Sequence, residues 1–401
     1  MSKIITDEKI IDEILTRGVE NIFPNKEELK KVLMSGKRIK LYCGYDPTAT
    51  SLHIGNAISI NKLGQFQALG HEVIFLIGDF TGMIGDPTDK SATRKKLSRK
   101  EALKNSINYK KQASPFLKFN GKNKARVVYN SKWSDKLTFK DLIEISSNFT
   151  VQQMIQRDMF QQRLKEEKPI YLHEFLYPLA QGYDSVSMDV DLEIGGNDQT
   201  FNMLCGRDLM KAMKGKEKFV LTMKLLADDT GKKMGKTEGN IINLDETPEN
   251  MFGQVMAWSD GLIVSGFELC TNLQTEEINK IKEDLKNSSN NPRDIKVKLA
   301  YEITKINHGE KKAKKAEEIF IKTFQKKEIP DEIEEIKGSG NLGVVLVLKK
   351  VVSSMSEWRR LVDEGAIKKL SETGEEKITD FKIIATPGVY KIGKRRFVKI
   401  L

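Results

Sequence analysis

Residues 41–56, which read LYCGYDPTATSLHIGN, combine polar side chains with a turn at the end of an apolar strand. Thr48 and His53 supply hydrogen-bond donors, and Gly55 lets a ligand approach the backbone because it has no side chain. The pattern predicts a loop that runs onto a helix N-terminus, where unpaired N–H groups and the helix dipole attract anions. We therefore expect a phosphate-type site, with an ordinary loop carrying a surface histidine as the alternative.

A second group of polar residues lies within the apolar segment 170–184. Tyr177, Gln181 and Asp184 are spaced at i, i+4 and i+7, so they share one face of a helix. A phenol, an amide and a carboxylate among apolar neighbours suit a small polar ligand. A solvent-exposed polar stripe is the alternative, against which Pro178 and the flanking aromatic residues indicate burial.

Two further loops carry groups suited to a nucleotide. Gly195 and Gly196 end an alternating strand and would let a flat group lie against the backbone, while Asp198 can accept from ribose hydroxyls. Residues 227–240 hold three lysines between glycines, Lys232, Lys233 and Lys236, followed by Thr237. This loop is suited to clamping phosphates but does not match the Walker A pattern. A solvated basic loop is the alternative.

The predicted elements bring these loops to one edge of a parallel sheet. Strands at 39–43 and 73–77 flank a helix, which makes a βαβ unit, and ligands of such sheets bind at the carboxyl ends of the strands. There is no GxGxxG, so a dinucleotide site is not expected. We expect helices over 1–38, over most of 94–165 and over 247–330, and a further strand at 219–226.

Composition narrows the class of protein. A chain of 401 residues suggests two or three domains, and a net charge of +11 favours a polyanionic partner, with a lysine-rich proteome as the alternative. Three widely spaced cysteines predict neither a disulfide framework nor a metal site. We expect no membrane span and no signal peptide, hence a cytoplasmic protein. The basic C-terminal module after the glycine-rich segment 337–343 suits RNA backbone contact, or is a plain basic subdomain.

These pieces occur in a familiar order. LHIGN at 52–56 resembles the first signature of class I aminoacyl-tRNA synthetases, and KMGKT at 233–237 resembles the second. Together with GDP at 85–87, YPLAQGYD at 177–184 and IGGNDQ at 194–199, they make essentially the whole chain similar to the bacterial tyrosyl-tRNA synthetases. The resemblance implies an α/β protein with three parts: a Rossmann-like parallel-sheet catalytic domain (1–228), the second signature with an α-helical anticodon-binding domain (229–335), and a small α+β S4-like RNA-binding domain (340–401).

The resemblance also implies an activity and residue roles. Such an enzyme activates L-tyrosine with ATP, accompanied by Mg²⁺, and transfers it to tRNA(Tyr), as a homodimer with no protein-bound metal or organic cofactor. The implied catalytic residues are Thr48, His53, Asn56, Lys233, Lys236 and Thr237. The implied tyrosine-binding residues are Tyr42, Asp86, Tyr177, Gln181 and Asp184. The implied ATP-binding residues are Cys43, Gly44, Asp46, His53, Gly55, Gly196, Asp198 and Lys236, with Lys90 and Arg94 as further phosphate-binding cations.

Two departures from the family pattern stand out. Asn56 replaces the second histidine of the first signature, and Glu193 stands where many members have glutamine. The alternatives are a tryptophanyl-tRNA synthetase, a nucleotidyltransferase with a similar histidine loop, and an RNA-binding paralogue with weakened catalysis.

Overall fold

The computed structural model describes residues 3–87, 97–228, 241–286, 291–322, 334–371, 374–393 and 396–401. Lys90, Arg94 and the second signature at 233–237 lie outside these ranges, so their predicted roles stay predictions. The chain packs as two compact units, Met1–Ala313 and Lys314–Leu401. Within the described residues, no helix is long and apolar enough to cross a membrane.

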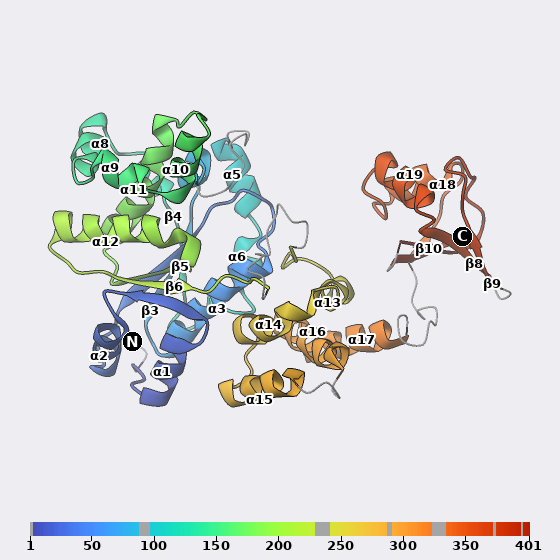
Figure 1. The fold of residues 1–401 in the computed structure, drawn as a ribbon, viewed down its shortest axis with the longest axis horizontal. Helices are drawn as coiled ribbons and strands as arrows, with labels where there is room; N and C mark the ends of the chain where they lie inside the picture. The colour runs from blue at the N-terminus through green and yellow to red at the C-terminus, as the bar shows by residue number, and fades with distance from the viewer. Residues whose placement is uncertain are drawn as a thin grey trace. The chain divides into compact units, whose positions relative to one another are not determined.

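A six-stranded sheet forms the centre of the first unit (Figure 1). Its strands run in the order β1-β6-β5-β2-β3-β4, and only β1 is antiparallel to its neighbour. Their bounds are β1 Val19–Phe23, β2 Lys40–Tyr45, β3 Glu72–Ile77, β4 Arg126–Tyr129, β5 Leu192–Gly196 and β6 Phe219–Met223. The chain proceeds from β2 to β3 and β4 on one side, then to β5 and β6 on the other. The order therefore reverses between β2 and β5, where open α/β sheets bind their ligands.

Helices cover both faces of this sheet, as expected for parallel strands buried on both sides (Figure 1). Helix α3 packs against β2, β3 and β5. Helix α12 packs against β5 and β6, and also against helix α11. The helices up to α12 are α1 Glu8–Thr16, α2 Lys26–Met34, α3 Ile54–Ala68, α4 Thr81–Ile84, α5 Arg99–Ser106, α6 Tyr109–Ala113, α7 Ser131–Ser134, α8 Phe139–Ser146, α9 Val151–Ile155, α10 Asp158–Lys165, α11 Leu172–Met188 and α12 Thr200–Lys214. The predicted α/β class is confirmed.

Two of the six strands lie in segments where the sequence predicted helices, and β1 contradicts the prediction for 1–38. β1 interrupts the helices expected over 1–38 and pairs antiparallel with β6. β4 interrupts the segment 94–165 and pairs with β3, because Val127 and Val128 fit a half-buried strand. Each strand is short and lies at an edge of the sheet, and its partner is distant in the sequence. Local periodicity therefore gave no sign of either.

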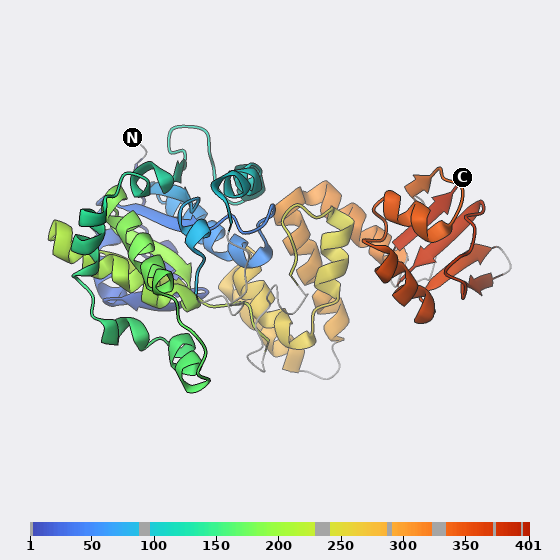
Figure 2. The ribbon, with the colours of Figure 1, turned by 90° about the horizontal axis from the view of Figure 1, so that it is seen from above.

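A group of helices follows the sheet (Figure 2). Its members are α13 Pro248–Met256, α14 Ile263–Cys270, α15 Thr275–Lys286, α16 Pro292–His308 and α17 Glu310–Phe320. Thr247 caps α13 and Asn291 caps α16, each ahead of a proline at the first helical position.

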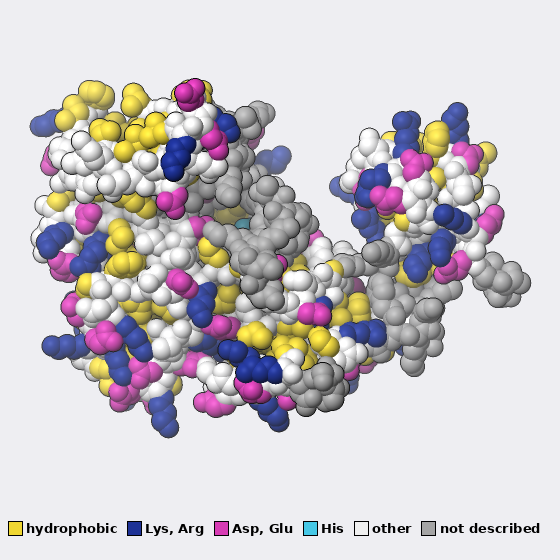
Figure 3. Space-filling model, in the orientation of Figure 1, with side chains coloured by type: hydrophobic (Ala, Val, Ile, Leu, Met, Phe, Trp, Pro, Cys, Tyr) yellow, Lys and Arg dark blue, Asp and Glu magenta, His cyan; other side chains and the backbone are white. Residues whose placement is uncertain are grey.

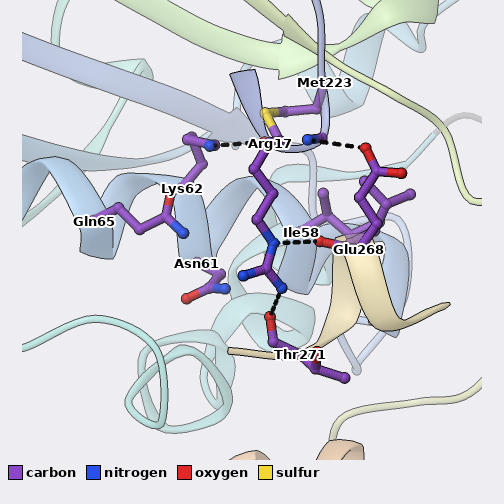
Figure 4. Close-up of a pocket in the computed structure, with 10 residues that line it drawn as sticks. Arg17, Ile58, Asn61, Lys62, Gln65, Met223, Glu268 and Thr271 are labelled. Atoms are coloured by element: carbon purple, nitrogen blue, oxygen red, sulfur yellow. Dashed lines mark hydrogen bonds between the residues drawn. The ribbon is translucent and has the colours of Figure 1, made fainter. Parts of the chain in front are cut away.

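Arg17 ties the first helix of the chain to the end of α14 (Figure 4). Its Nε donates to the carbonyl oxygen of Glu268 at 3.0 Å, and Nη2 donates to that of Thr271 at 2.6 Å. Beside it, the buried Nζ of Lys62 donates to the carbonyl oxygens of Ile14 and Arg17 at 2.7 and 3.0 Å. Burial and the neighbouring Arg17 charge lower the pKa of Lys62 to about 7.

The second unit is a small α+β structure. Its sheet runs in the order β7-β11-β10-β8-β9, with β7 Glu334–Ile336, β8 Ile367–Ser371, β9 Gly374–Lys377, β10 Gly388–Ile392 and β11 Arg396–Ile400, beside helices α18 Leu342–Leu348 and α19 Met355–Asp363. Trp358 and Tyr390 are fully buried in its core. Ser354 caps α19 by accepting from the Glu357 N–H at 3.1 Å. The predicted α+β character of this module is confirmed.

Candidate active site

Asp46 stands at the end of β2, where the polar loop begins. Its Oδ2 accepts from the Tyr177 hydroxyl at 2.9 Å, and its Oδ1 accepts from the Thr81 hydroxyl at 2.6 Å. A side chain at Gly78 would bring Cβ to 1.9 Å from Asp46 Oδ1, so the close approach needs glycine. Asp46 is therefore fixed by contacts from two other elements, and it orients Tyr177 within the site.

Asp184 lies about two turns beyond Tyr177 along α11, and it is 2% exposed. Its Oδ1 accepts from Trp133 Nε1 at 2.8 Å, and its Oδ2 accepts from Asn130 Nδ2 at 3.2 Å. Burial raises the pKa of Asp184 well above its ordinary value, and the two N–H donors oppose that shift by stabilising the carboxylate. Of the predicted polar stripe, Tyr177 and Asp184 are buried and Gln181 is half-buried. Trp133 and Asn130 were not among the predicted residues.

Tyr42 of β2 faces α11 but does not pair with Asp184 directly. Its hydroxyl lies 2.9 Å from Ser185 Oγ, the residue next to Asp184. Ser185 Oγ also accepts from Lys218 Nζ at 2.8 Å. Burial raises the pKa of the Tyr42 hydroxyl well above its ordinary value, so it stays protonated at neutral pH.

Glu193 of β5 also belongs to the hydrogen-bonded group of Tyr42, Ser185 and Lys218. Its carboxylate pairs with the ammonium group of Lys218, and its Oε1 accepts from Gln181 Nε2 at 3.0 Å. The glutamate that stands here in place of glutamine is therefore paired with a buried lysine. Ser185 and Lys218 were missed at the sequence level, because neither stands in a signature.

The first signature surrounds the N-terminus of α3. Asn56 Oδ1 accepts from the backbone N–H of His53 at 3.0 Å, so this asparagine caps the helix. Gly55 and Thr48 are exposed, and a Cβ at Gly55 would lie 3.0 Å from His53 Nδ1. The glycine therefore leaves room for the imidazole ring and for a ligand beside it.

Residues 242–244, which follow the second signature in the sequence, lie against the first signature. His53 forms a β-bridge with Asn243, in which the Ile54 N–H donates to the Ile242 carbonyl oxygen at 2.9 Å. The Leu244 N–H likewise donates to the Leu52 carbonyl oxygen at 2.8 Å. Residues 242–244, which come after the second signature in the chain, are thus joined through the backbone to the first signature.

The remaining predicted residues lie at the ends of β2, α4 and β5. Asp86 accepts from Gln199 Nε2 at 2.7 Å, and its charge acts on the buried Arg157. Gly196 lies against Asp198, to whose Oδ1 an added Cβ would approach within 2.5 Å. Gln199 and Arg157 were not predicted to be site residues, although Gln199 is the last residue of the IGGNDQ motif.

Cys43 and Gly44 both lie on β2, but they differ in their exposure to solvent. Cys43 is buried, and burial raises the pKa of its thiol to about 11, so it carries no charge at neutral pH. Gly44 is exposed. Of the two, only Gly44 is open to a ligand in the structure.

Comparison with known proteins places the chain in a family. Residues 34–325 match the family model "tRNA synthetases class I (W and Y)". The tyrosine–tRNA ligase of Carboxydothermus hydrogenoformans is 45% identical over 97% of both chains, and that of Haemophilus ducreyi is 44% identical over 96% of both.

Solved structures share the fold. A C-terminally truncated mitochondrial tyrosyl-tRNA synthetase of Coccidioides posadasii matches with a TM-score of 0.63 and 24% identity, over 77% of this chain and 91% of that one. The tyrosyl-tRNA synthetase of Archaeoglobus fulgidus, complexed with L-tyrosine, matches with a TM-score of 0.60 and 19% identity, over 78% of this chain and 100% of that one. The family model and the relatives that are 44–45% identical, together with this fold, show that the chain belongs to the class I tRNA synthetases of the tryptophan and tyrosine type, among the tyrosine–tRNA ligases.

Proposed function

We propose that this protein is a tyrosine–tRNA ligase that activates L-tyrosine with ATP and transfers it to tRNA(Tyr). The observation that carries the proposal is the buried carboxylate of Asp184, held by Trp133 and Asn130 beside the Tyr42 hydroxyl. A buried acceptor next to a phenolic donor suits the hydroxyl group of tyrosine, and both would be left unpaired by phenylalanine.

The predicted residues keep their roles in this proposal, including Lys236, Lys90 and Arg94 as cations that bind the phosphates of ATP. Tyr42 and Asp184 bind the phenolic hydroxyl, and Asp86, Tyr177 and Gln181 surround the α-ammonium group. Ribose and adenine lie over exposed backbone at the ends of β2 and β5. The residues proposed for ATP are Cys43, Gly44, Asp46, His53, Gly55, Gly196 and Asp198, and those proposed for catalysis are Thr48, His53, Asn56, Lys233, Lys236 and Thr237.

The proposed chemistry needs positioning more than acid–base catalysis. The tyrosine carboxylate is already a nucleophile, and its oxygen attacks the α-phosphorus of ATP while the bond to pyrophosphate breaks. His53 and the helix α3 N-terminus stabilise the charge that develops on the phosphates. Mg²⁺ enters with ATP as part of that substrate. The terminal ribose hydroxyl of the tRNA then attacks the tyrosyl carbonyl carbon, and AMP leaves.

The tRNA contacts are proposed for the rest of the chain. We assign catalysis to residues 1–228, anticodon contact to 229–335 with the second signature, and further RNA contact to the S4-like part 340–401. In the last, Arg359 and Lys382 lie over the ring of Phe381, 5.4 and 5.9 Å from its centroid. Cations around an exposed aromatic ring suit contact with phosphates and bases.

A homodimer is proposed from an apolar surface on the first unit. Hydrophobic side chains gather over helices α8 to α10, at the upper left of the view (Figure 3). Among them Phe139 is 79% exposed, Val151 69% and Ile143 55%. Exposed apolar patches of this kind mark protein contact sites. The proposed compartment is the cytoplasm, where tRNA is charged.

The test is amino-acid-dependent ATP–pyrophosphate exchange with tyrosine, tryptophan and phenylalanine in parallel. Exchange with tyrosine alone, followed by charging of tRNA(Tyr), is the expected result. Exchange with tryptophan would instead mean that the site around Asp184 is a tryptophan site. Absence of exchange with all three amino acids would point to an RNA-binding paralogue.

A further inference from the structure

A buried ion pair is linked through Ser185 to Tyr42, one of the side chains proposed to bind the tyrosine hydroxyl. The Lys218 and Glu193 side chains are 0% and 2% exposed, and Lys218 Nζ also donates to Ser185 Oγ at 2.8 Å. Removing two charges from water is costly, and an apolar pair of similar size is often as stable. Packing alone therefore does not account for these charges.

The chemistry of the three groups fixes which way the Ser185 hydroxyl points. Lysine only donates and a carboxylate only accepts, so Ser185 accepts from Lys218 and has one proton left to donate. That proton has two possible acceptors, Tyr42 Oη at 2.9 Å and Glu193 Oε2 at 3.4 Å. The shorter contact makes the better hydrogen bond, and Lys218 already balances the charge of Glu193. Ser185 thus donates to Tyr42.

The direction of this bond decides what Tyr42 offers to a ligand. Because its oxygen accepts from Ser185, the phenolic proton of Tyr42 is available to the next oxygen. The neighbouring Asp184 carboxylate can only accept. A ligand hydroxyl that accepts from Tyr42 and donates to Asp184 satisfies both groups, which a bare aromatic ring cannot do.

We propose that Lys218 and Ser185 are positioning residues that orient the hydrogen bonds of the tyrosine site, with Lys218 donating to Ser185, Ser185 to Tyr42, and Tyr42 to the substrate hydroxyl. This inference rests on the proposed function, since it takes tyrosine as the substrate. Glu193 anchors the arrangement because it holds Lys218 and Gln181 at once. Helix α12 makes room for it, since a Cβ at Gly206 would lie 2.6 Å from Lys218 Nζ.

Removal of Lys218 alone would reverse the chain of hydrogen bonds. The Glu193 carboxylate would lose its counter-charge and attract the proton of Ser185, since charged acceptors bind donors more strongly. Tyr42 would then donate to Ser185, and the substrate hydroxyl would face two acceptors. Replacement of Glu193 by glutamine in the same chain reverses this effect, because an amide N–H₂ in place of Oε2 donates to Ser185 as Lys218 does.

The experiment compares Ser185→Ala, Lys218→Met and the double variant Lys218→Met/Glu193→Gln. The readout is the ratio of kcat/KM for tyrosine over phenylalanine in ATP–pyrophosphate exchange, with KM for ATP and the thermal midpoint measured alongside. We expect the ratio to fall about tenfold in both single variants and to recover to within about threefold of wild type in the double variant. Matched controls are Ser187→Ala, an exposed serine of the same helix, and Lys216→Met, whose lysine pairs at the surface with Asp189 and Asp191.

The ratio separates this inference from a purely structural role, which would lower the thermal midpoint and leave discrimination intact. A Ser185→Ala ratio within about twofold of wild type would overturn the proposal. A folded double variant that discriminates no better than Lys218→Met would do the same. If Lys218→Met does not fold, Ser185→Ala and the double variant carry the test. A wild-type protein with no tyrosine-dependent exchange would refute the proposed function itself, and that measurement comes first.

Discussion

The hydroxyl of Tyr177 donates to Asp46 Oδ2 at 2.9 Å and joins the middle of helix α11 to the end of strand β2. Asp46 is held from a second side by Thr81, whose hydroxyl donates to it at 2.6 Å. The polar stripe of α11 and the loop that leads into the first signature therefore share the half-buried carboxylate of Asp46 as an anchor. Their relative position is set before a ligand binds, which lowers the cost of ordering the site.

Replacement of Tyr177 by phenylalanine tests this anchor. We expect KM for tyrosine to rise about tenfold and KM for ATP to change little, because one hydrogen bond near the ammonium group is lost. The free energy of unfolding should fall by about 1 kcal/mol, since Asp46 loses a donor. Steady-state exchange kinetics and urea unfolding measure both. Tyr183→Phe on the same helix is the control, and a larger effect on ATP than on tyrosine would contradict the proposed role.

Asp184→Asn should weaken tyrosine recognition more than ATP binding. The carboxylate accepts from Trp133 and Asn130, whereas the amide has only one acceptor oxygen and turns a donor towards one of them. We expect kcat/KM for tyrosine to fall at least about 100-fold and the preference over phenylalanine to shrink with it. The ratio of the two kcat/KM values is the measurement. An unchanged ratio would refute the assignment of Asp184 to the phenolic hydroxyl.

Two substitutions of Asn56 distinguish a helix-capping role from a catalytic role. Asn56→Ala removes the acceptor of the His53 N–H and should cost about 1 kcal/mol of stability. Asn56→Asp keeps the acceptor and the cap, but its charge would repel the phosphates of ATP. We expect Asn56→Asp to unfold like wild type and to lose about tenfold or more in kcat. If the two variants lose activity only in proportion to stability, Asn56 is a cap and nothing more.

Because His71 is buried, we expect the protein to lose stability in mild acid. Burial, together with the nearby charge of Arg38, lowers the pKa of His71 to about 4, and its buried Nε2 has no hydrogen-bond partner among the described residues. An unfolded histidine binds a proton near pH 6.5, whereas the folded one does so only near pH 4. The stability from neutral His71 is therefore complete above about pH 6.5 and is lost as the pH falls towards 4.

The expected size of this effect is about 1–2 kcal/mol between pH 7 and pH 5. Urea unfolding of wild type and His71→Gln at both values measures it, and the variant should lose less stability between them. His173→Gln, which alters an exposed histidine, is the control. Equal losses in wild type and in His71→Gln would show that other groups dominate the acid response.

The parts of the molecule that were predicted from the sequence are those with a local signal. The i, i+4, i+7 spacing located Tyr177, Gln181 and Asp184 on one helix face, and that helix is present. The order of apolar strands and the loops behind them identified the parallel sheet and its ligand-binding edge. The signature motifs identified the family.

The parts that were missed depend on contacts between distant segments. Ser185 and Lys218 are 33 positions apart, and Lys218 stands in a charged run that is typical of a surface. Trp133 and Asn130 reach Asp184 from more than 50 positions away. No periodicity marks such pairs, because burial of a polar group follows from the packing of α11 against α12 and β5.

The guanidinium group of Arg17 has a practical consequence for shortened forms of this enzyme. Every signature residue lies after position 40, so a chain trimmed to begin near β2 would look catalytically complete. Such a chain would lack β1 and leave carbonyl oxygens of residues 267 to 273 without their donor. It would also expose the edge of β6 that pairs with β1, and strands of other chains could then pair with it. We therefore expect the smallest fragment that folds as a working catalyst to start at the first helix, upstream of the residues proposed to bind substrate.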